Sequence, residues 1–156
     1  MNILVVIEHS QGSIHRLSKE AIVGAQSLGN KVTALVIGEA SEEAISFLKA
    51  CDIERVLIVD HELVKSYNAD GYASIVSQVI VTLSPNLIIA GHTYQTRDFM
   101  PRVSAKLRLP FIPDIVSVSD NKYIKQVLNA KLSAEISSSM NPVSYTHLRA
   151  HETRSD

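Results

Sequence analysis

The chain has 156 residues, 46% of them apolar and 20% charged, with a formal net charge of -1. This composition is that of one folded domain, and it excludes a disordered chain and a nucleic-acid binder that depends on a basic surface. The single cysteine, Cys51, excludes an internal disulfide; we expect it to be a buried structural thiol, and we expect no metal site. No apolar segment approaches the roughly 20 residues that cross a bilayer, so membrane insertion is not expected.

The first residues, MNILVVIEHS, lead directly into an apolar, strand-like run. They lack the basic leader and cleavage region of a signal peptide. This start favours a bacterial cytoplasmic location over secretion.

Four short apolar runs are typical of strands that are covered on both faces. In chain order they are NILVVI, KVTALVI, RVLIVD and NLIIA. Between them the sequence predicts helices over 14–28, after a cap at Ser41, and over 72–83 after a possible cap at Asp70. This alternation predicts a three-layer α/β fold, in which an open, mostly parallel sheet carries helices on both faces.

The pattern changes after Leu107. LPFIPDIVSVS contains two prolines and an alternating segment, and YIKQVL and KLSAEIS predict two more strands joined near Asn129. Apolar and polar residues alternate in the last of these, so one of its faces is expected to be wet. We therefore expect an antiparallel C-terminal annex to the sheet.

The loop after the first strand, EHSQGSIHRLS, contains only Gly12. A dinucleotide fingerprint needs three spaced glycines there, and no phosphate-binding GxxxxGK[ST], HExxH or GxSxG pattern occurs. Glu8 and His9 stand at the end of this strand, where α/β sheets bind ligands. We favour the interpretation that they point in different directions, one covered and one exposed, over an acid/base pair.

The stretch GHTYQTRDFMPR, residues 91–102, holds the candidate ligand site. Because Pro101 lacks an N–H, it fits the first turn of a helix, which places the N-cap within two residues of Asp98. Helix N-termini attract anions through free N–H groups and the helix dipole. The candidate phosphate-binding residues are Gly91, Thr93, Thr96 and Arg97.

A structural role explains the same residues equally well. Asp98 then caps the helix, and Arg97 or Arg102 pairs with a carboxylate at a domain or subunit contact. The spacing alone leaves both interpretations open.

From Met1 to about Pro142 the chain resembles the amino-terminal domain of the electron-transfer flavoprotein alpha subunit. ILVVIEHSQGSI is similar to the start of that family, and GHTYQTRDFMPRVSAKLRLPFIPDI is similar to its G-x-T-x-x-x-R-D-x-x-P-R-x-A-x-L motif and the strand that follows. YIKQVLNAKLSAEI resembles a later segment. Thr96 and Ala130 stand where the family often has glycine. The resemblance implies a Rossmann-like fold of the adenine nucleotide alpha hydrolase-like type.

The resemblance implies a function for the intact protein. With its beta subunit it would carry electrons from flavin dehydrogenases, such as the acyl-CoA dehydrogenases of fatty acid beta-oxidation, to a respiratory acceptor. FAD would be bound mainly by a C-terminal domain that this sequence lacks, and AMP by the beta partner only. The present chain would then be a folding and subunit-docking domain, inactive alone and without catalytic residues, and the structural role of Arg97, Asp98 and Arg102 is favoured.

The alternative is a free-standing AMP- or ATP-binding domain of the universal-stress type. Such proteins carry G-x-x-G and a later Gly-Ser/Thr after the fourth strand. Here Gly91 stands alone through Lys106, which argues against that class.

The last residues, VSYTHLRAHETRSD, lack an apolar period, and VSYTHLRAHET resembles a transposon sequencing adapter translated in one frame. We therefore expect residues 1–142 to be the native, truncated domain and residues 143–156 to be a non-native tail.

Overall fold

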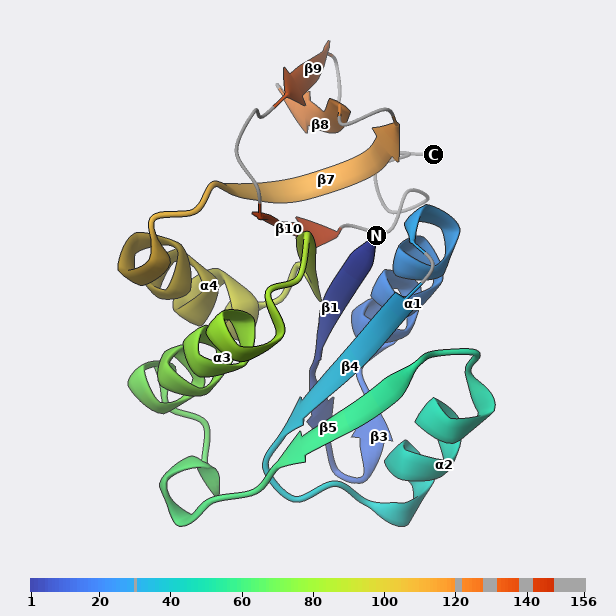
Figure 1. Ribbon diagram of the computed structural model, residues 1–156, viewed down its shortest axis with the longest axis vertical. Coiled ribbons are helices and arrows are strands. Elements are labelled where there is room, and N and C mark those ends of the chain that lie inside the picture. The colour runs from blue at the N-terminus through green and yellow to red at the C-terminus, as the bar shows by residue number, and fades with distance from the viewer. Residues whose placement is uncertain (30, 120–121, 128–131, 138–141, 148–156) are drawn as a thin grey trace.

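The secondary-structure elements alternate between strands and helices through the first two thirds of the chain (Figure 1). The computed structural model describes residues 1–29, 31–119, 122–127, 132–137 and 142–147. The strands are β1 Asn2–Ile7, β2 His9–Ser10, β3 Ser13–Ile14, β4 Lys31–Ile37, β5 Arg55–Val59, β6 Leu87–Gly91, β7 Phe111–Ser119, β8 Lys122–Val127, β9 Leu132–Ser137 and β10 Val143–His147. The helices are α1 Arg16–Leu28, α2 Glu42–Ala50, α3 Ala69–Leu83 and α4 Tyr94–Leu107, with a short 3-10 turn, η1, at Glu62–Val64.

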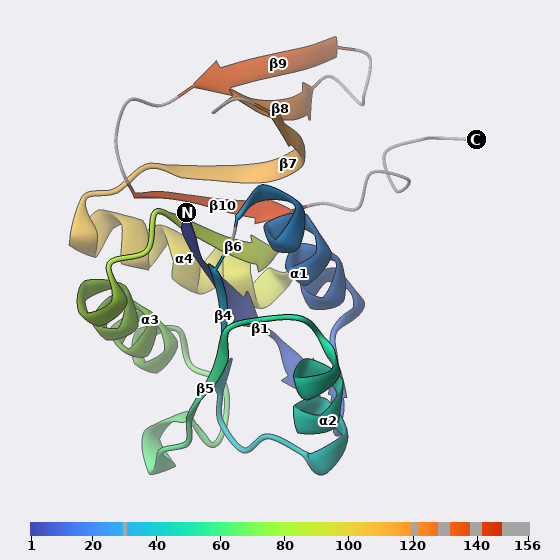
Figure 2. The same ribbon diagram turned by 45° about the vertical axis from the view of Figure 1, so that its right-hand side comes forward.

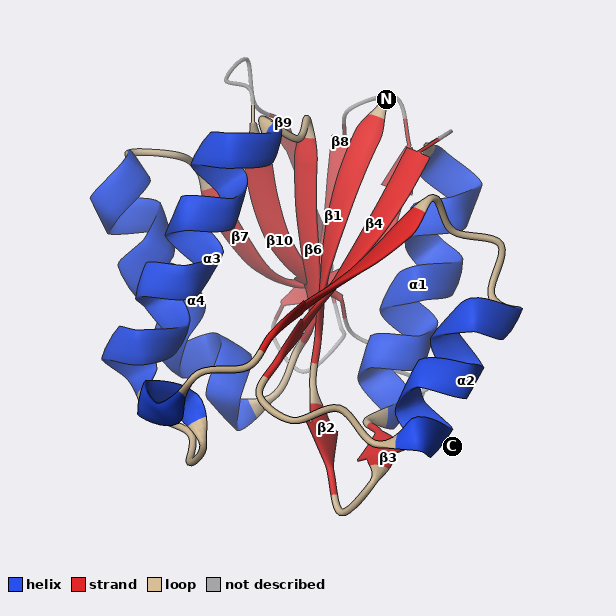
Figure 3. Ribbon diagram, turned by 60° about the horizontal axis from the view of Figure 1, so that its bottom comes forward, coloured by secondary structure: helices blue, strands red, loops and turns tan. Residues whose placement is uncertain are grey.

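Eight strands form one sheet in the order β5-β4-β1-β6-β10-β7-β8-β9, and β2 and β3 form a separate small hairpin. Helices α1 and α2 cover one face of the sheet, and α3 and α4 cover the other (Figure 3). Side chains of β1 alternate between the two cores: Ile3 and Val5 face the α1 side, whereas Leu4 and Val6 face the α3 side. Because both faces are buried, these strands are continuously apolar, and the predicted three-layer α/β fold is confirmed.

Strands β7, β8 and β9 form the antiparallel annex at one end of the sheet (Figure 2). Along β9, Ser133, Glu135 and Ser137 are exposed, whereas Ala134 and Ile136 are half-buried. The annex and its wet face are therefore confirmed. The predicted turn at Asn129 lies outside the described residues.

Strand β10 lies between β6 and β7 and runs parallel to both. Its Tyr145 is 1% exposed and packs against Tyr123, with 5.6 Å between the ring centroids. Residues 143–147 therefore belong to the sheet, and the expected end of the native sequence near Pro142 stays a prediction. Val, Tyr and Thr favour extended backbone, so this short polar-looking segment suits a strand position. Its adapter origin stays a prediction.

Side chains at the helix ends confirm one predicted cap and correct another. Ser41 Oγ accepts a hydrogen bond from Ala44 N at 3.0 Å, as predicted. At α3, however, Asn68 is the N-cap, because its Oδ1 accepts from Gly71 N at 2.7 Å, and Asp70 lies within the first turn. Cys51 caps the C-terminus of α2 and is half-buried rather than buried; burial raises the pKa of its thiol.

Candidate functional site

The candidate site lies where the chain changes direction across the sheet. From β1 the chain adds β4 and β5 on one side, and α3 then carries it across to β6 on the other side of β1. Open α/β sheets bind ligands at such a point, beyond the carboxyl ends of the two strands. In this protein Glu8 follows the carboxyl end of β1, and His92 and Thr93 follow that of β6.

Glu8 closes this position from the β1 side. The Thr93 hydroxyl donates to Glu8 Oε1 at 2.5 Å, and Glu8 N donates to Ser18 Oγ at 2.8 Å. His9 turns the other way, and its Nε2 donates to Ile37 O at 2.8 Å, at the end of β4. The prediction of different directions is confirmed, but both residues are half-buried, so the expected exposure of one is wrong.

The N-cap of helix α4 is Thr93, five residues before Asp98, and the helix itself begins at Tyr94. Thr93 and Thr96 form a capping box: Thr96 N donates to Thr93 Oγ1 at 3.2 Å, and Thr93 N donates to Thr96 Oγ1 at 3.0 Å. The Thr96 hydroxyl also bonds to Gly91 O. The predicted cap at Asp98 is therefore wrong, and Pro101 lies inside the helix, because these reciprocal bonds fix the start of the helix earlier.

Gly91, the last residue of β6, lies directly beneath α1. A Cβ atom added at Gly91 would lie 2.7 Å from Leu17 Cβ and 3.0 Å from the Leu17 carbonyl carbon. Backbone and side chain of α1 thus occupy the space that a phosphate would need in order to reach Gly91. The Glu8 carboxylate also places negative charge at the N-terminus of α4, where a phosphate would otherwise be favoured.

We predict that Gly91→Ala destabilises the protein by about 1–3 kcal/mol, because α1 must move away from β6. The urea midpoint of unfolding measures this. Gly24→Ala is the matched control: nothing lies within 4 Å of a Cβ at this helical position, so it should stabilise the protein by about 0.5–1 kcal/mol. Equal midpoints for the two variants would contradict the close contact.

Arg97 does not join the other candidates. Its guanidinium lies 5.7 Å from the centre of the Tyr94 ring, and Tyr94 is 88% exposed. Gly91 is buried under Leu17, and Thr93 is bonded to Glu8. Of the four candidate phosphate-binding residues, Gly91, Thr93 and Thr96 are thus joined by hydrogen bonds to one another, whereas the Arg97 side chain lies over Tyr94.

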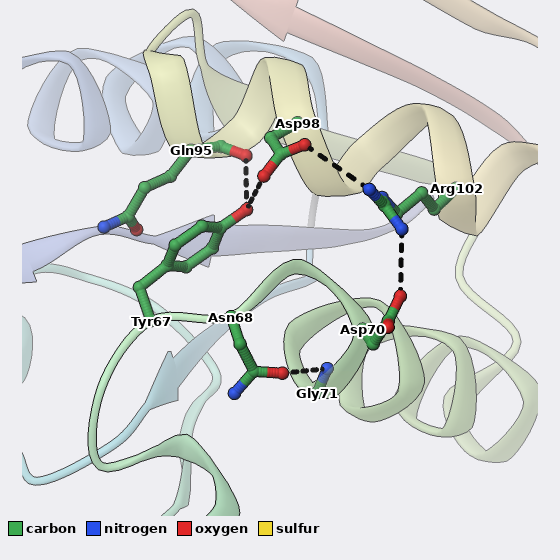
Figure 4. Close-up of polar contacts among 7 residues, drawn as sticks. All are labelled: Tyr67, Asn68, Asp70, Gly71, Gln95, Asp98 and Arg102. Atoms are coloured by element: carbon green, nitrogen blue, oxygen red, sulfur yellow. Dashed lines mark hydrogen bonds and ion pairs between the residues drawn. The ribbon is translucent and has the colours of Figure 1, made fainter.

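Asp98 and Arg102 belong to a polar cluster between α3 and α4 (Figure 4). The Tyr67 hydroxyl donates to Asp98 Oδ2 at 2.8 Å, and burial together with this bond raises the pKa of Tyr67 far above its usual range. Arg102 lies 2.9 Å from Asp70 Oδ1 and 3.8 Å from Asp98 Oδ1. Arg102 thus pairs with carboxylates as predicted, but within the domain. Both ion pairs are exposed, so each contributes only about 0–1 kcal/mol.

His92 joins the ends of β6, β7 and β10. Its Nδ1 lies 2.9 Å from Thr146 Oγ1, which also accepts from Asp114 N at 2.8 Å. Since the Thr146 hydroxyl has one proton, this arrangement suits a neutral imidazole that accepts it. Burial lowers the pKa of His92, and Arg97 and Lys125 lower it further, although the Asp114 carboxylate opposes them.

This lowered pKa predicts an acid-sensitive contribution to stability. In the unfolded chain His92 takes up a proton near pH 6.5. The contribution of neutral His92 to the free energy of unfolding is therefore fully present above about pH 6.5. It falls as the pH drops from there toward the pKa of His92 in the folded chain, by at most about 1.4 kcal/mol per pH unit. Urea unfolding between pH 7.5 and 5 should show a shallower loss for His92→Asn than for the unmodified chain. Parallel curves would contradict it.

Two contacts at this end of the sheet were not predicted from the sequence. Glu8 and Thr93 are far apart in the chain, and the available signal was that each follows a strand whose carboxyl end meets the same sheet edge. The bond from Tyr67 to Asp98 had no sequence signal, because the loop that positions Tyr67 follows η1 without a recognisable motif.

Together, the fold and this region define an open α/β domain in which side chains at the switch point bond to one another. A family model for the electron transfer flavoprotein domain matches residues 3–147. The chain belongs to this family, which confirms the resemblance seen in the sequence.

The similarity to curated relatives is distant and covers part of each. The electron transfer flavoprotein subunit alpha of Bacillus subtilis is 29% identical over 119 residues, which are 75% of this chain and 37% of the relative. A probable mitochondrial alpha subunit of Caenorhabditis elegans is 32% identical over 116 residues, which are 74% of this chain and 35% of the relative. The acryloyl-CoA reductase electron transfer subunit beta of Anaerotignum propionicum is 28% identical over 154 residues, and the match covers 95% of this chain and 42% of the relative. The chain thus spans between about a third and two fifths of these relatives.

Helices in the described part of the chain are too short or too polar to cross a bilayer.

Proposed function

We propose that the chain is the amino-terminal domain of an electron transfer flavoprotein alpha subunit, acting as a folding and docking domain for the beta subunit. The family match supports this assignment, as do the relatives named as alpha subunits. In the complete protein, bound FAD would accept and donate the electrons that flavin dehydrogenases supply and a respiratory acceptor receives. We place the protein in the bacterial cytoplasm.

The observation that carries this proposal is the pair of contacts made by Gly91 and Thr93 at the switch point. Leu17 covers Gly91, and the Glu8 carboxylate occupies the α4 N-terminus through Thr93. A pyrophosphate needs both an approachable backbone and free N–H groups. The residues present here therefore do not fit FAD or AMP, and we derive no electron-transfer step through this domain. Its contribution is structural.

Assembly with the beta subunit tests the proposal directly. The chain is mixed with the electron transfer flavoprotein beta subunit from the same source, and the mass is measured by light scattering during gel filtration. We expect a one-to-one complex that binds AMP through the beta subunit, while the isolated chain binds neither FAD nor AMP. Failure to form a complex would contradict the docking role.

The universal-stress alternative makes the opposite prediction for the chain alone. Titration with labelled AMP or ATP should then show tight binding that Arg97→Ala abolishes. We expect no binding by the unmodified chain or by Arg97→Ala, because the Arg97 guanidinium lies over the exposed Tyr94 ring.

We also propose that residues 143–156 derive from a sequencing adapter, although residues 143–147 form β10 in the structure. In that case β10 fills a place that the natural continuation of the gene would fill. Independent reads of the source DNA across codon 143 test this. A gene that continues unchanged in all reads would overturn the proposal.

A further inference from the structure

A polar hollow lies at the amino ends of β1, β4 and β5, at the opposite end of the sheet from the switch point. It has a volume of about 460 Å³ and is lined by residues of these strands and by Leu83 and Pro85 after α3. Helix α3 stops here because Ser84 adopts a left-handed conformation, with φ of 48°. The α3-side face of the sheet is thus left uncovered at this end.

The floor of the hollow is a row of residues paired across three strands. Leu4 pairs with Thr33, and Thr33 pairs with Arg55; Lys31 lies two residues before Thr33 on the same face. Further along β1, β4 and β6, this face of the sheet consists of buried Leu, Val, Ile and Ala side chains. At the amino ends of β4 and β5, where α3 no longer covers the strands, a threonine and two cations replace these apolar residues.

These polar groups have no partners within the described part of the chain. Thr33 is 8% exposed, and its hydroxyl makes no hydrogen bond to another described residue. Lys31, Arg55 and Glu54 form no ion pair with any described residue, although all three line the same hollow. The side chains of Lys31, Glu54 and Arg55 are exposed, so water hydrates them in the free chain, and a ligand in the hollow can exchange that water for direct hydrogen bonds.

We propose that this hollow binds a phosphate monoester that carries hydroxyl groups, an inference that goes beyond the proposed docking function. The guanidinium of Arg55 can bind a phosphate through two N–H groups, with Lys31 and the Thr33 hydroxyl as further donors. Glu54 and the carboxyl end of α3, marked by Leu83, are negative. They accept hydrogen bonds from ligand hydroxyl groups and repel a second phosphate, so the site selects a monoester over a polyphosphate.

Amide chemical shifts of the 17.1 kDa chain provide the test. Ribose 5-phosphate is titrated to about 10 mM, well above the affinity range of weak sites, with inorganic phosphate and ribose as separate probes. We expect ribose 5-phosphate to shift the amides of Lys31, Thr33 and Arg55 with Kd of about 1 mM or below. Inorganic phosphate should bind more weakly, and ribose should not bind.

Three variants make the result specific. Thr33→Val removes only the hydroxyl, and Arg55→Ala removes the forked donor; each should weaken binding by about tenfold. Lys49→Ala removes an exposed cation on α2, on the other face of the sheet, and should change nothing. The proposal is overturned if none of the three amides shifts, if Lys49→Ala weakens binding as much as Arg55→Ala, or if inorganic phosphate binds as tightly as the ester. Amide spectra of each variant show whether it is folded.

Discussion

A chain that stops at Pro142 should lose cooperative unfolding and aggregate, whereas a chain that stops at His147 should behave like the 156-residue chain. Removal of β10 leaves β6 and β7 without the strand that joins them. It also removes the fully buried Tyr145, and loss of a large aromatic side chain alone costs about 3–5 kcal/mol. Because domains of this kind are stable by only about 5–15 kcal/mol, the shortened chain should be close to unfolded.

The exposed surface explains the aggregation. Unpaired strand edges and uncovered apolar side chains promote association between chains. Urea unfolding followed by circular dichroism, together with gel filtration, measures both effects. Tyr145→Ala in the 156-residue chain separates the packing of one ring from the loss of the whole strand. A monodisperse monomer of residues 1–142 with a sharp unfolding transition would show that β10 is not needed.

Thr93→Val should destabilise the protein by about 3 kcal/mol, at least as much as Gly91→Ala. The substitution keeps the shape of the side chain but removes an N-cap, worth about 1–2 kcal/mol. It also removes the donor to Glu8, and a hydrogen bond to a charged group is worth about 1.5–3 kcal/mol. The urea midpoint again measures the change.

Two controls support the assignment to this contact. Thr82→Val is the same chemical change at an exposed position of α3 and should alter stability by less than about 0.5 kcal/mol. In a double-mutant cycle with Glu8→Gln, the effects of the two substitutions should not add. Additive effects would mean that Glu8 and Thr93 stabilise the fold independently.

The sheet and its helices could be predicted because their signals are local. The runs that became β1, β4, β5 and β6 are apolar throughout because both faces are covered, and period and punctuation separate them from the helices. The antiparallel annex was predicted for the same reason, from alternation in its last strand.

Contacts that depend on tertiary structure could not be predicted in this way. Pro101 is a strong local signal for a helix start, but the reciprocal bonds of Thr93 and Thr96 place that start earlier. Asn68 and Asp70 are both good N-caps, and only the backbone geometry decides between them. The contacts of Glu8 and Leu17 at the switch point required knowing that segments distant in the chain meet.

The position of β10 also constrains how the molecule can fold as it is synthesised. Strands β5, β4, β1 and β6 are complete early, whereas the strand that completes the far side of β6 is translated after the entire annex. At about 5–20 residues per second, the nascent chain therefore presents the open edge of β6 for seconds on the ribosome. During that interval a chaperone has a defined surface to protect, and β7 can contact α4 but is not yet joined to β6 through β10.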